Sequence, residues 1–235
     1  MKTFIYKTLA LALSTCLLTS CDQDTEAEVK PLGSTNTAYF GTVPGTTIID
    51  FSENTGFIDH VMVVKDSYTT LPVKITAKQY TNGRPVAGNA ALVFDTRKPD
   101  GQHSGYKAVN EGPFQLGNVL TIGQTQGRNN TLYDKGGSIE MDFSSFGSIV
   151  MRGLYVADID ASEKGSTLEM LNAAGEVIYE MELPVTGAYT FQPIMFGDGV
   201  AGVVKLRVTF KSRNGMGGSG AIDVIQFCPG SVCYN

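Results

Sequence analysis

Several aspartates in this sequence stand in or beside apolar runs, where an ionised carboxylate is costly unless a cation or hydrogen bonds compensate for the lost water. Asp95 ends one apolar run and Asp223 lies inside another. Asp158 and Asp160 stand two residues apart, so in a strand they would share a face with the apolar residues that precede them. Because Ca2+ prefers oxygen ligands, this pattern predicts a calcium site. The alternative is that these aspartates end strands or accept backbone N–H groups in turns.

Catalytic motifs are scarce. The chain has two histidines, His60 and His103, but it lacks the Gly-x-Ser-x-Gly nucleophile elbow of a Ser-His-Asp hydrolase. The nearest match is Gly217-Gly-Ser-Gly-Ala, whose second glycine falls one place early. A glycosidase needs two facing carboxylates, and spacing along the chain pairs none of the acidic candidates. We therefore expect no enzyme, with a secreted hydrolase as the alternative, built from two of Asp134, Glu140, Asp142, Glu163 and Glu169.

Sugar binding usually relies on aromatic side chains, and the absence of Trp removes the most effective of them. Tyr106 and Tyr133 fall in long polar segments, 97–117 and 123–137, and the second of these also holds Arg128. Long loops on a rigid scaffold commonly carry binding residues. We expect these three side chains to contact a ligand; the alternative is that the tyrosines cover a sheet edge.

The elements that must position these residues are all β-strands. From Ala38 onward, short apolar alternations are separated by Gly, Pro, Asn and Asp, and no 3.6-residue period persists. Asn172–Gly175 is expected to form a tight turn, and Lys205, Arg207 and Thr209 are expected to face outward. The expected strands are Thr47–Phe51, Val61–Val64, Val73–Gln79, Ala91–Asp95, Val119–Ile122, Ser138–Phe143, Ile149–Asp160, Thr167–Leu171, Val177–Glu182, Tyr189–Phe196, Val203–Phe210 and Ala221–Phe227.

The first residues have the features of an export signal. Lys2 and Lys7 precede an uncharged run, Leu9–Leu18, which as a helix would be only about 15 Å long and too short to cross a membrane. Leu18-Thr-Ser-Cys21 follows and resembles the bacterial lipobox, in which the cysteine receives the lipid. The alternative is an ordinary secretory signal with a chance cysteine.

This resemblance divides the chain into residues 1–20 as signal peptide, 21–37 as lipidated Cys21 and flexible tether, and 38–235 as one β domain. Acyl chains would anchor the protein stably to a membrane. The acidic stretch after Cys21 also resembles the surface-export signal of Bacteroidetes lipoproteins. The expected location is the cell envelope, at the outer membrane or cell surface.

Charge and cysteine content agree with that location. Loss of Lys2 and Lys7 with the signal leaves 16 of the 18 basic residues against 23 acidic ones, a formal net charge of −7 once the new N-terminus is acylated. An acidic chain of this kind is a poor partner for nucleic acid. Cys228 and Cys233 flank a Pro-Gly turn, and a disulfide between them fits an oxidising compartment.

The order of several motifs resembles secreted bacterial jelly-roll domains of the galactose-binding-like and carbohydrate-binding kind. These motifs are Ala91-Leu-Val-Phe-Asp-Thr, Gly117-Asn-Val-Leu-Thr-Ile, Gly136-Gly-Ser-Ile-Glu-Met-Asp-Phe, Ala157-Asp-Ile-Asp, Asn172-Ala-Ala-Gly-Glu-Val and Gly220-Ala-Ile-Asp-Val-Ile-Gln-Phe. The resemblance implies an all-β, jelly-roll-like antiparallel β-sandwich with a structural Ca2+ held by Asp223, with Asp50 and Asp95 as co-ligands.

The expected function is therefore that of a lipid-anchored, non-catalytic binding or structural module at the cell envelope. Its expected partners are the membrane, reached through the lipid, and a glycan or another surface protein. A protein–protein adhesin or assembly subunit is the further alternative, for which a large exposed apolar patch would be the sign.

Overall fold

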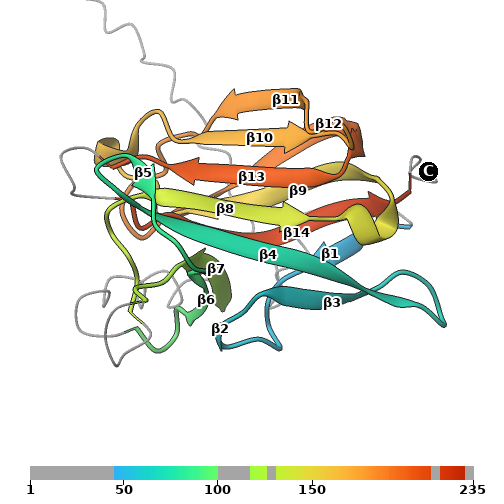
Figure 1. Ribbon diagram of the computed structural model, residues 1–235, viewed down its shortest axis with the longest axis horizontal. Coiled ribbons are helices and arrows are strands. Elements are labelled where there is room, and N and C mark those ends of the chain that lie inside the picture. Colours follow the sequence, from blue (N-terminus) through green and yellow to red (C-terminus); the bar gives the residue numbers. More distant parts are fainter. Residues whose placement is uncertain (1–44, 100–116, 126–130, 213–217, 231–235) are drawn as a thin grey trace, which may run out of the picture. The chain divides into compact units, whose positions relative to one another are not determined.

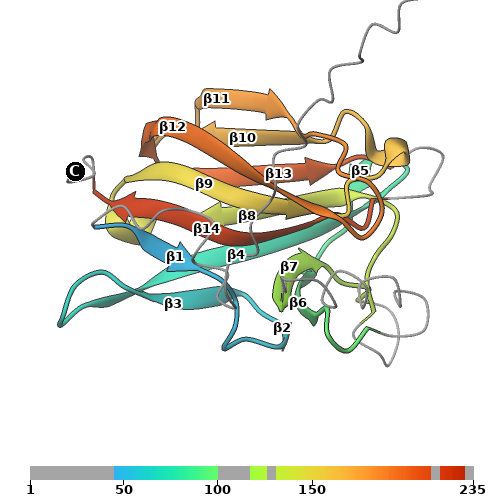
Figure 2. The ribbon, with the colours of Figure 1, turned by 180° about the vertical axis from the view of Figure 1, so that it is seen from behind.

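Two antiparallel sheets form the protein, and we describe them from a computed structural model that covers residues 45–99, 117–125, 131–212 and 218–230. Sheet A lies in front in Figure 2, and sheet B lies in front in Figure 1. In spatial order, sheet A consists of β12 (Phe191–Val203), β9 (Ile149–Ala157), β14 (Ala221–Pro229), β7 (Asn118–Ile122), β6 (Ala91–Asp95) and β2 (Gly56–Phe57), with β1 (Thr47–Ile49) paired to β14.

Sheet B has the same number of strands, and short 3-10 turns η2 (Ser144–Phe146) and η3 (Ala161–Glu163) complete the described elements. Its strands in spatial order are β11 (Val177–Glu182), β10 (Thr167–Leu171), β13 (Lys205–Phe210), β8 (Gly137–Asp142), β4 (Thr70–Thr81) and β3 (His60–Val64), with β5 (Arg84–Pro85) paired to β4. The all-β, jelly-roll-like sandwich expected from the sequence is confirmed.

One apolar core lies between the sheets. Alternate residues of both sheets supply it, as period-two strands with one buried face require. At one end of this core Phe227 of β14 packs edge-to-face against Phe143 and Phe146, with ring centroids 5.1 Å and 5.6 Å apart. Leu206, Val208 and Phe210 point into the core, so the predicted outward orientation of Lys205, Arg207 and Thr209 is confirmed.

The outer faces of the two sheets differ. The outer face of sheet A carries a second apolar cluster that includes Leu92, Phe94 and Val119, all buried. On sheet B, the outward side chains of β4, β8 and β13 are mostly polar and exposed or half-exposed, whereas those of β3 are His60, Met62 and Val64. The open polar surface of the sandwich is therefore the outer face of sheet B.

Most strand boundaries agree with the sequence to within two residues, but the expected strand Tyr189–Phe196 is too short, since β12 continues to Val203, and the expected strand Ile149–Asp160 is too long. β9 ends at Ala157, because Asp158 adopts a left-handed backbone with φ 58°. The turn at Asn172–Gly175 is confirmed: Asn172 N–H donates to the Glu176 carbonyl at 3.0 Å, and Gly175 has φ 79°.

No helix in the described part of the chain has the length and apolar character that a membrane crossing requires. Cys21, with the whole signal and tether, lies outside the described residues, as does Cys233. Cys228 is buried near the end of β14. The lipid anchor and the Cys228–Cys233 disulfide therefore stay predictions.

Candidate functional site

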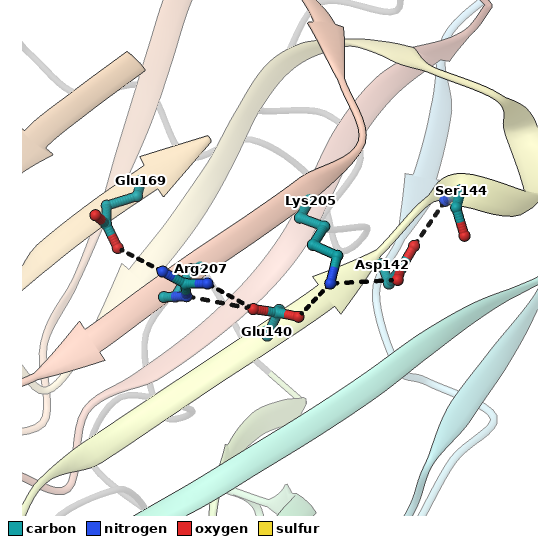
Figure 3. Close-up of polar contacts among 6 residues, drawn as sticks. All are labelled: Glu140, Asp142, Ser144, Glu169, Lys205 and Arg207. Carbon is teal, nitrogen blue, oxygen red and sulfur yellow. Dashed lines mark hydrogen bonds and ion pairs between the residues drawn. The ribbon is translucent and has the colours of Figure 1, made fainter. Parts of the chain in front are cut away.

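A ladder of charged side chains crosses the outer face of sheet B (Figure 3). We call the five residues Glu140, Asp142, Glu169, Lys205 and Arg207 the polar ladder; they come from β8, β10 and β13. Lys205 Nζ lies 2.9 Å from Glu140 Oε1 and 3.6 Å from Asp142 Oδ2. One lysine thus joins two carboxylates of the neighbouring strand.

Arg207 extends the ladder across the next strand. Its Nη2 lies 3.0 Å from Glu140 Oε2, and its Nη1 lies 3.4 Å from Glu169 Oε2. Strand register explains this, since Arg207 stands opposite Glu140 on β8 and opposite Glu169 on β10. The Arg207 side chain is 36% exposed and Glu169 is 23% exposed, so the ladder is open to a ligand from one side.

The contacts within the polar ladder favour the ionised forms of Glu140 and Lys205. Partial burial disfavours the ionised form of Glu140, but Lys205 and Arg207 outweigh that cost and lower its pKa. The same contacts raise the pKa of Lys205, chiefly through the hydrogen bond to Glu140. At neutral pH the ladder is an array of paired charges in fixed positions.

Hydroxyl groups extend this surface on both sides. Thr76 of β4 stands opposite Glu140, and Thr209 of β13 stands opposite Ser138. Tyr80, half-buried near the end of β4, donates its hydroxyl to Ser138 Oγ at 3.4 Å. The outer face of sheet B therefore offers fixed charges, hydroxyls and one tyrosine ring together.

Asp223 is the most unusual carboxylate of sheet A. It is 1% exposed, and in the described part of the chain neither of its carboxylate oxygens has a hydrogen-bond partner. Burial raises the pKa of Asp223 well above its ordinary value. The nearby Val224 amide opposes this shift although it does not meet hydrogen-bond geometry, and the charge of Asp50 adds to the shift. Asp50 is therefore a neighbouring negative charge that opposes ionisation of Asp223.

The turn after Asp50 presents three backbone carbonyls to one side chain. Asn118 Nδ2 donates to the carbonyls of Phe51, Ser52 and Asn54 at 3.2, 3.3 and 2.8 Å. Phe51 adopts φ 54°, which turns the chain into this arrangement. These carbonyl oxygens already have a donor in Asn118.

The other predicted calcium ligands are engaged elsewhere. Asp95 Oδ1 lies 2.7 Å from Arg97 Nε, and the Arg97 contact lowers the pKa of Asp95 against the effect of burial. Asp158 accepts from Tyr189 N–H at 2.6 Å, and Asp160 accepts from Ser162 N–H at 2.6 Å. Within the described ranges, no three acidic, His or Cys side chains gather closely enough to hold a metal ion.

The expectation that Asp158 and Asp160 continue one strand face is wrong. The left-handed backbone of Asp158 breaks the alternation, and Asp160 begins the 3-10 turn η3 as its N-cap. Both residues therefore act as turn and cap acceptors, which was the alternative that the sequence left open.

Of the predicted ligand-binding loop residues, Tyr106 and Arg128 lie outside the described residues. Tyr133 is half-buried against the core, and its hydroxyl donates to the Tyr80 carbonyl at 2.8 Å. This contact fits the alternative of a tyrosine that covers a sheet edge.

No family model and no curated protein matches this sequence. Among solved structures, the CBM27-1 module of Caldicellulosiruptor saccharolyticus in complex with mannohexaose matches with a TM-score of 0.40 and 12% identity, over 80% of this chain and 98% of that one.

Two further structures are similarly distant. The lectin domain of lectinolysin, as a His 62 mutant complexed with Lewis b, has a TM-score of 0.38 and 11% identity, over 66% of this chain and 92% of its own. TmCBM61 in complex with β-1,4-galactotriose has a TM-score of 0.33 and 16% identity, over 59% and 82%. These likenesses are too remote to carry a function to this chain.

Glu163 is a second buried acid, near the start of β14. Its Oε1 accepts from Gly220 N–H at 3.1 Å and its Oε2 accepts from Asp160 N–H at 2.9 Å. Burial raises the pKa of Glu163 to about 8; the two amides oppose this shift, and the charges of Asp158 and Asp160 add to it.

Glu163→Gln tests this assignment. Because the folded pKa of about 8 is above the ordinary value of 4.5, the stabilisation is complete below about pH 4.5 and is lost as pH rises through 8. One group of this kind makes the free energy of unfolding fall by up to about 1.4 kcal/mol per pH unit in that window. Urea denaturation from pH 5 to pH 9 should show a smaller fall for Glu163→Gln. Glu180→Gln, on an exposed glutamate, should keep the parent slope, and an unchanged slope in Glu163→Gln would contradict the assignment.

Proposed function

We propose that this protein is a non-catalytic glycan-binding module that binds its ligand on the outer face of sheet B. The observation that carries this proposal is the polar ladder, in which Arg207 joins Glu140 and Glu169 on an open, rigid sheet surface. Sugar hydroxyls donate to carboxylates and accept from guanidinium groups, so this arrangement supplies both partners at fixed positions. Tyr80 supplies an aromatic ring at the same face.

The charge balance of the ladder favours an uncharged ligand. Lys205 and Arg207 already pair with Glu140, Asp142 and Glu169, so both cations are compensated inside the surface and one negative charge is left over. A charged ligand would have to break these pairs, whereas hydroxyl groups can bind alongside them. Neutral oligosaccharides are therefore the proposed ligand class.

The hydrolase alternative has weaker support. An acid catalyst must hold a proton near neutral pH. Glu140 has a lowered pKa and stays ionised. Glu163 has a raised pKa but is 0% exposed and binds two backbone amides, so no substrate reaches it.

We further propose that Asp223, with Asp50, holds a structural Ca2+. A buried carboxylate without a hydrogen-bond partner fits a cation better than it fits an apolar environment. Bound Ca2+ would supply the missing positive charge and would tie the turn after β1 to β14. We also propose that a lipid on Cys21 tethers the protein to the cell envelope.

Arg207→Gln is the direct test of the glycan face. We expect it to weaken binding by at least about tenfold, since a charged hydrogen bond contributes about 1.5–3 kcal/mol. The measurement is titration calorimetry after a screen of neutral oligosaccharides, with mannohexaose and galactotriose among the probes. Lys98→Ala, an exposed cation just after β6 in sheet A, is the matched control and should bind like the parent. Absence of binding across the screen, or equal binding by Arg207→Gln, would contradict the proposal.

A thermal melt tests the calcium proposal. Millimolar Ca2+ should raise the Tm of the parent by about 5 °C relative to EDTA. Asp223→Asn should lose that response, while Asp198→Asn, at an exposed aspartate of β12, should keep it. If the parent shows no response and Asp223→Asn is as stable or more stable, the carboxyl is buried in its protonated form without a metal.

Membrane fractionation tests the anchor. Cys21→Ser should move the protein from the membrane fraction to the soluble one, because acyl chains contribute about 0.8 kcal/mol per buried CH2. Cys16→Ser is the control, since Cys16 precedes the proposed cleavage site and should leave the distribution unchanged. A Cys21→Ser protein that stays on the membrane would refute the lipid anchor.

A further inference from the structure

Strand β3 forms one end of sheet B, and its outward backbone groups have no partner among the described residues. The amide of Lys65 donates to the Thr69 carbonyl at 2.8 Å, and that of Ile75 donates to the Asp59 carbonyl at 2.7 Å. This pattern assigns the odd-numbered residues of the segment to hydrogen bonds with β4. The amide and carbonyl groups of the even-numbered residues therefore point away from the sheet, and no backbone hydrogen bond given by the described residues reaches them.

The side chains of this edge are apolar and exposed. Met62 is 57% exposed and Val64 is 64% exposed, on the same face as His60. Lysine, proline or a bulge commonly protects a free edge, but His60–Val64 contains none of these. The first charged side chains stand just outside the strand, Asp59 before it and Lys65 after it.

We propose that β3 pairs antiparallel with β3 of a second copy of this chain, about a two-fold axis at Met62. His60, Met62 and Val64 are the residues whose backbone groups point away from the sheet edge. All three can form hydrogen bonds with the same residues of the second copy only when Met62 opposes Met62 and His60 opposes Val64. The same register places Asp59 of each copy opposite Lys65 of the other. The backbone pattern and the charge pattern thus select one register independently.

The resulting dimer extends sheet B through both copies. A two-fold axis perpendicular to the sheet keeps the two outer faces on the same side. Both polar ladders would then face one surface, which would give a bivalent glycan binder with increased avidity. That consequence rests on the proposed function, whereas the pairing of β3 does not.

Disulfide trapping tests the register. In this pairing the two Met62 Cα atoms stand directly opposite, at about 5.5 Å, within the range that a disulfide spans. The full chain with Cys21→Ser, which cannot carry the lipid, serves as the background. Met62→Cys should form a covalent dimer on mild oxidation with copper phenanthroline. Met195→Cys, at a methionine of β12 that is 53% exposed, should not.

Sedimentation equilibrium of the same background tests the interaction energetics. Met62→Lys places two like charges together at the axis and should raise the dimer Kd by about tenfold or more, while Met195→Lys should leave it unchanged. Asp59→Lys and Lys65→Asp should each raise the Kd about fivefold, and the double variant should restore it. The double exchange separates a lost charge pair from a folding defect.

Two results would overturn the proposal. One is a chain that stays monomeric up to about 1 mM, the weakest association that this experiment detects. The other is a dimer that Met62→Lys does not weaken, which would place the contact elsewhere. Neither result bears on glycan binding, which the Arg207→Gln titration measures separately.

Discussion

The pairing of β14 with β1, β7 and β9 holds sheet A together. β14 lies in the middle of the sheet and joins the start of the described chain to its end, since Thr47 stands opposite Phe227. Contacts between such distant parts of a sequence carry a large entropic cost of loop closure. The apolar residues of β14 offset that cost by packing into the core, with Phe227 between Phe143 and Phe146.

This arrangement leaves the two sheets with different tasks. The central strands of sheet A, β9, β14, β7 and β6, are buried on both faces, so few of their side chains are free for binding. Sheet B has one face in the core and one in contact with water, and its outward residues can change without loss of packing. The polar ladder thus lies on the face where charges cost least. Its ion pairs contribute little to stability at this exposure, and their main effect is to fix the positions of hydrogen-bonding groups.

Much of this architecture could be predicted from alternation alone. The strands Ala91–Asp95, Thr167–Leu171 and Val177–Glu182 are found with the expected bounds, because apolar and polar residues alternate or gather there in short runs between turn residues. The prediction failed at Asp158, where a non-glycine residue takes φ 58° to reach Tyr189 N–H and the donor is 31 residues away. No local pattern contains that information.

The polar ladder was harder to foresee as a site. Lys205 and Arg207 could be placed on the outer face from their alternation, but an outward lysine or arginine is the ordinary content of a solvated strand. What distinguishes them is the register that brings Glu140 and Glu169 to either side of Arg207. Register between strands far apart in the sequence depends on the whole sheet, so the sequence of each strand alone does not specify it.

Two buried acids near the start of β14, Glu163 and Asp223, require different physical explanations. Glu163 accepts two backbone amides, and these replace part of the water that it loses. Asp223 has no donor in hydrogen-bond geometry among the described residues. The next residue, Val224, is held at φ 47°, where a β-branched side chain is strained. Because β14 is fixed by pairing with β1, β7 and β9, it can hold both the desolvated Asp223 carboxyl group and the strained Val224 backbone. Because an apolar side chain at this position would avoid the desolvation cost, packing alone does not account for this carboxyl group. Its raised pKa fits a buried proton, and the proposed Ca2+ would take the place of that proton.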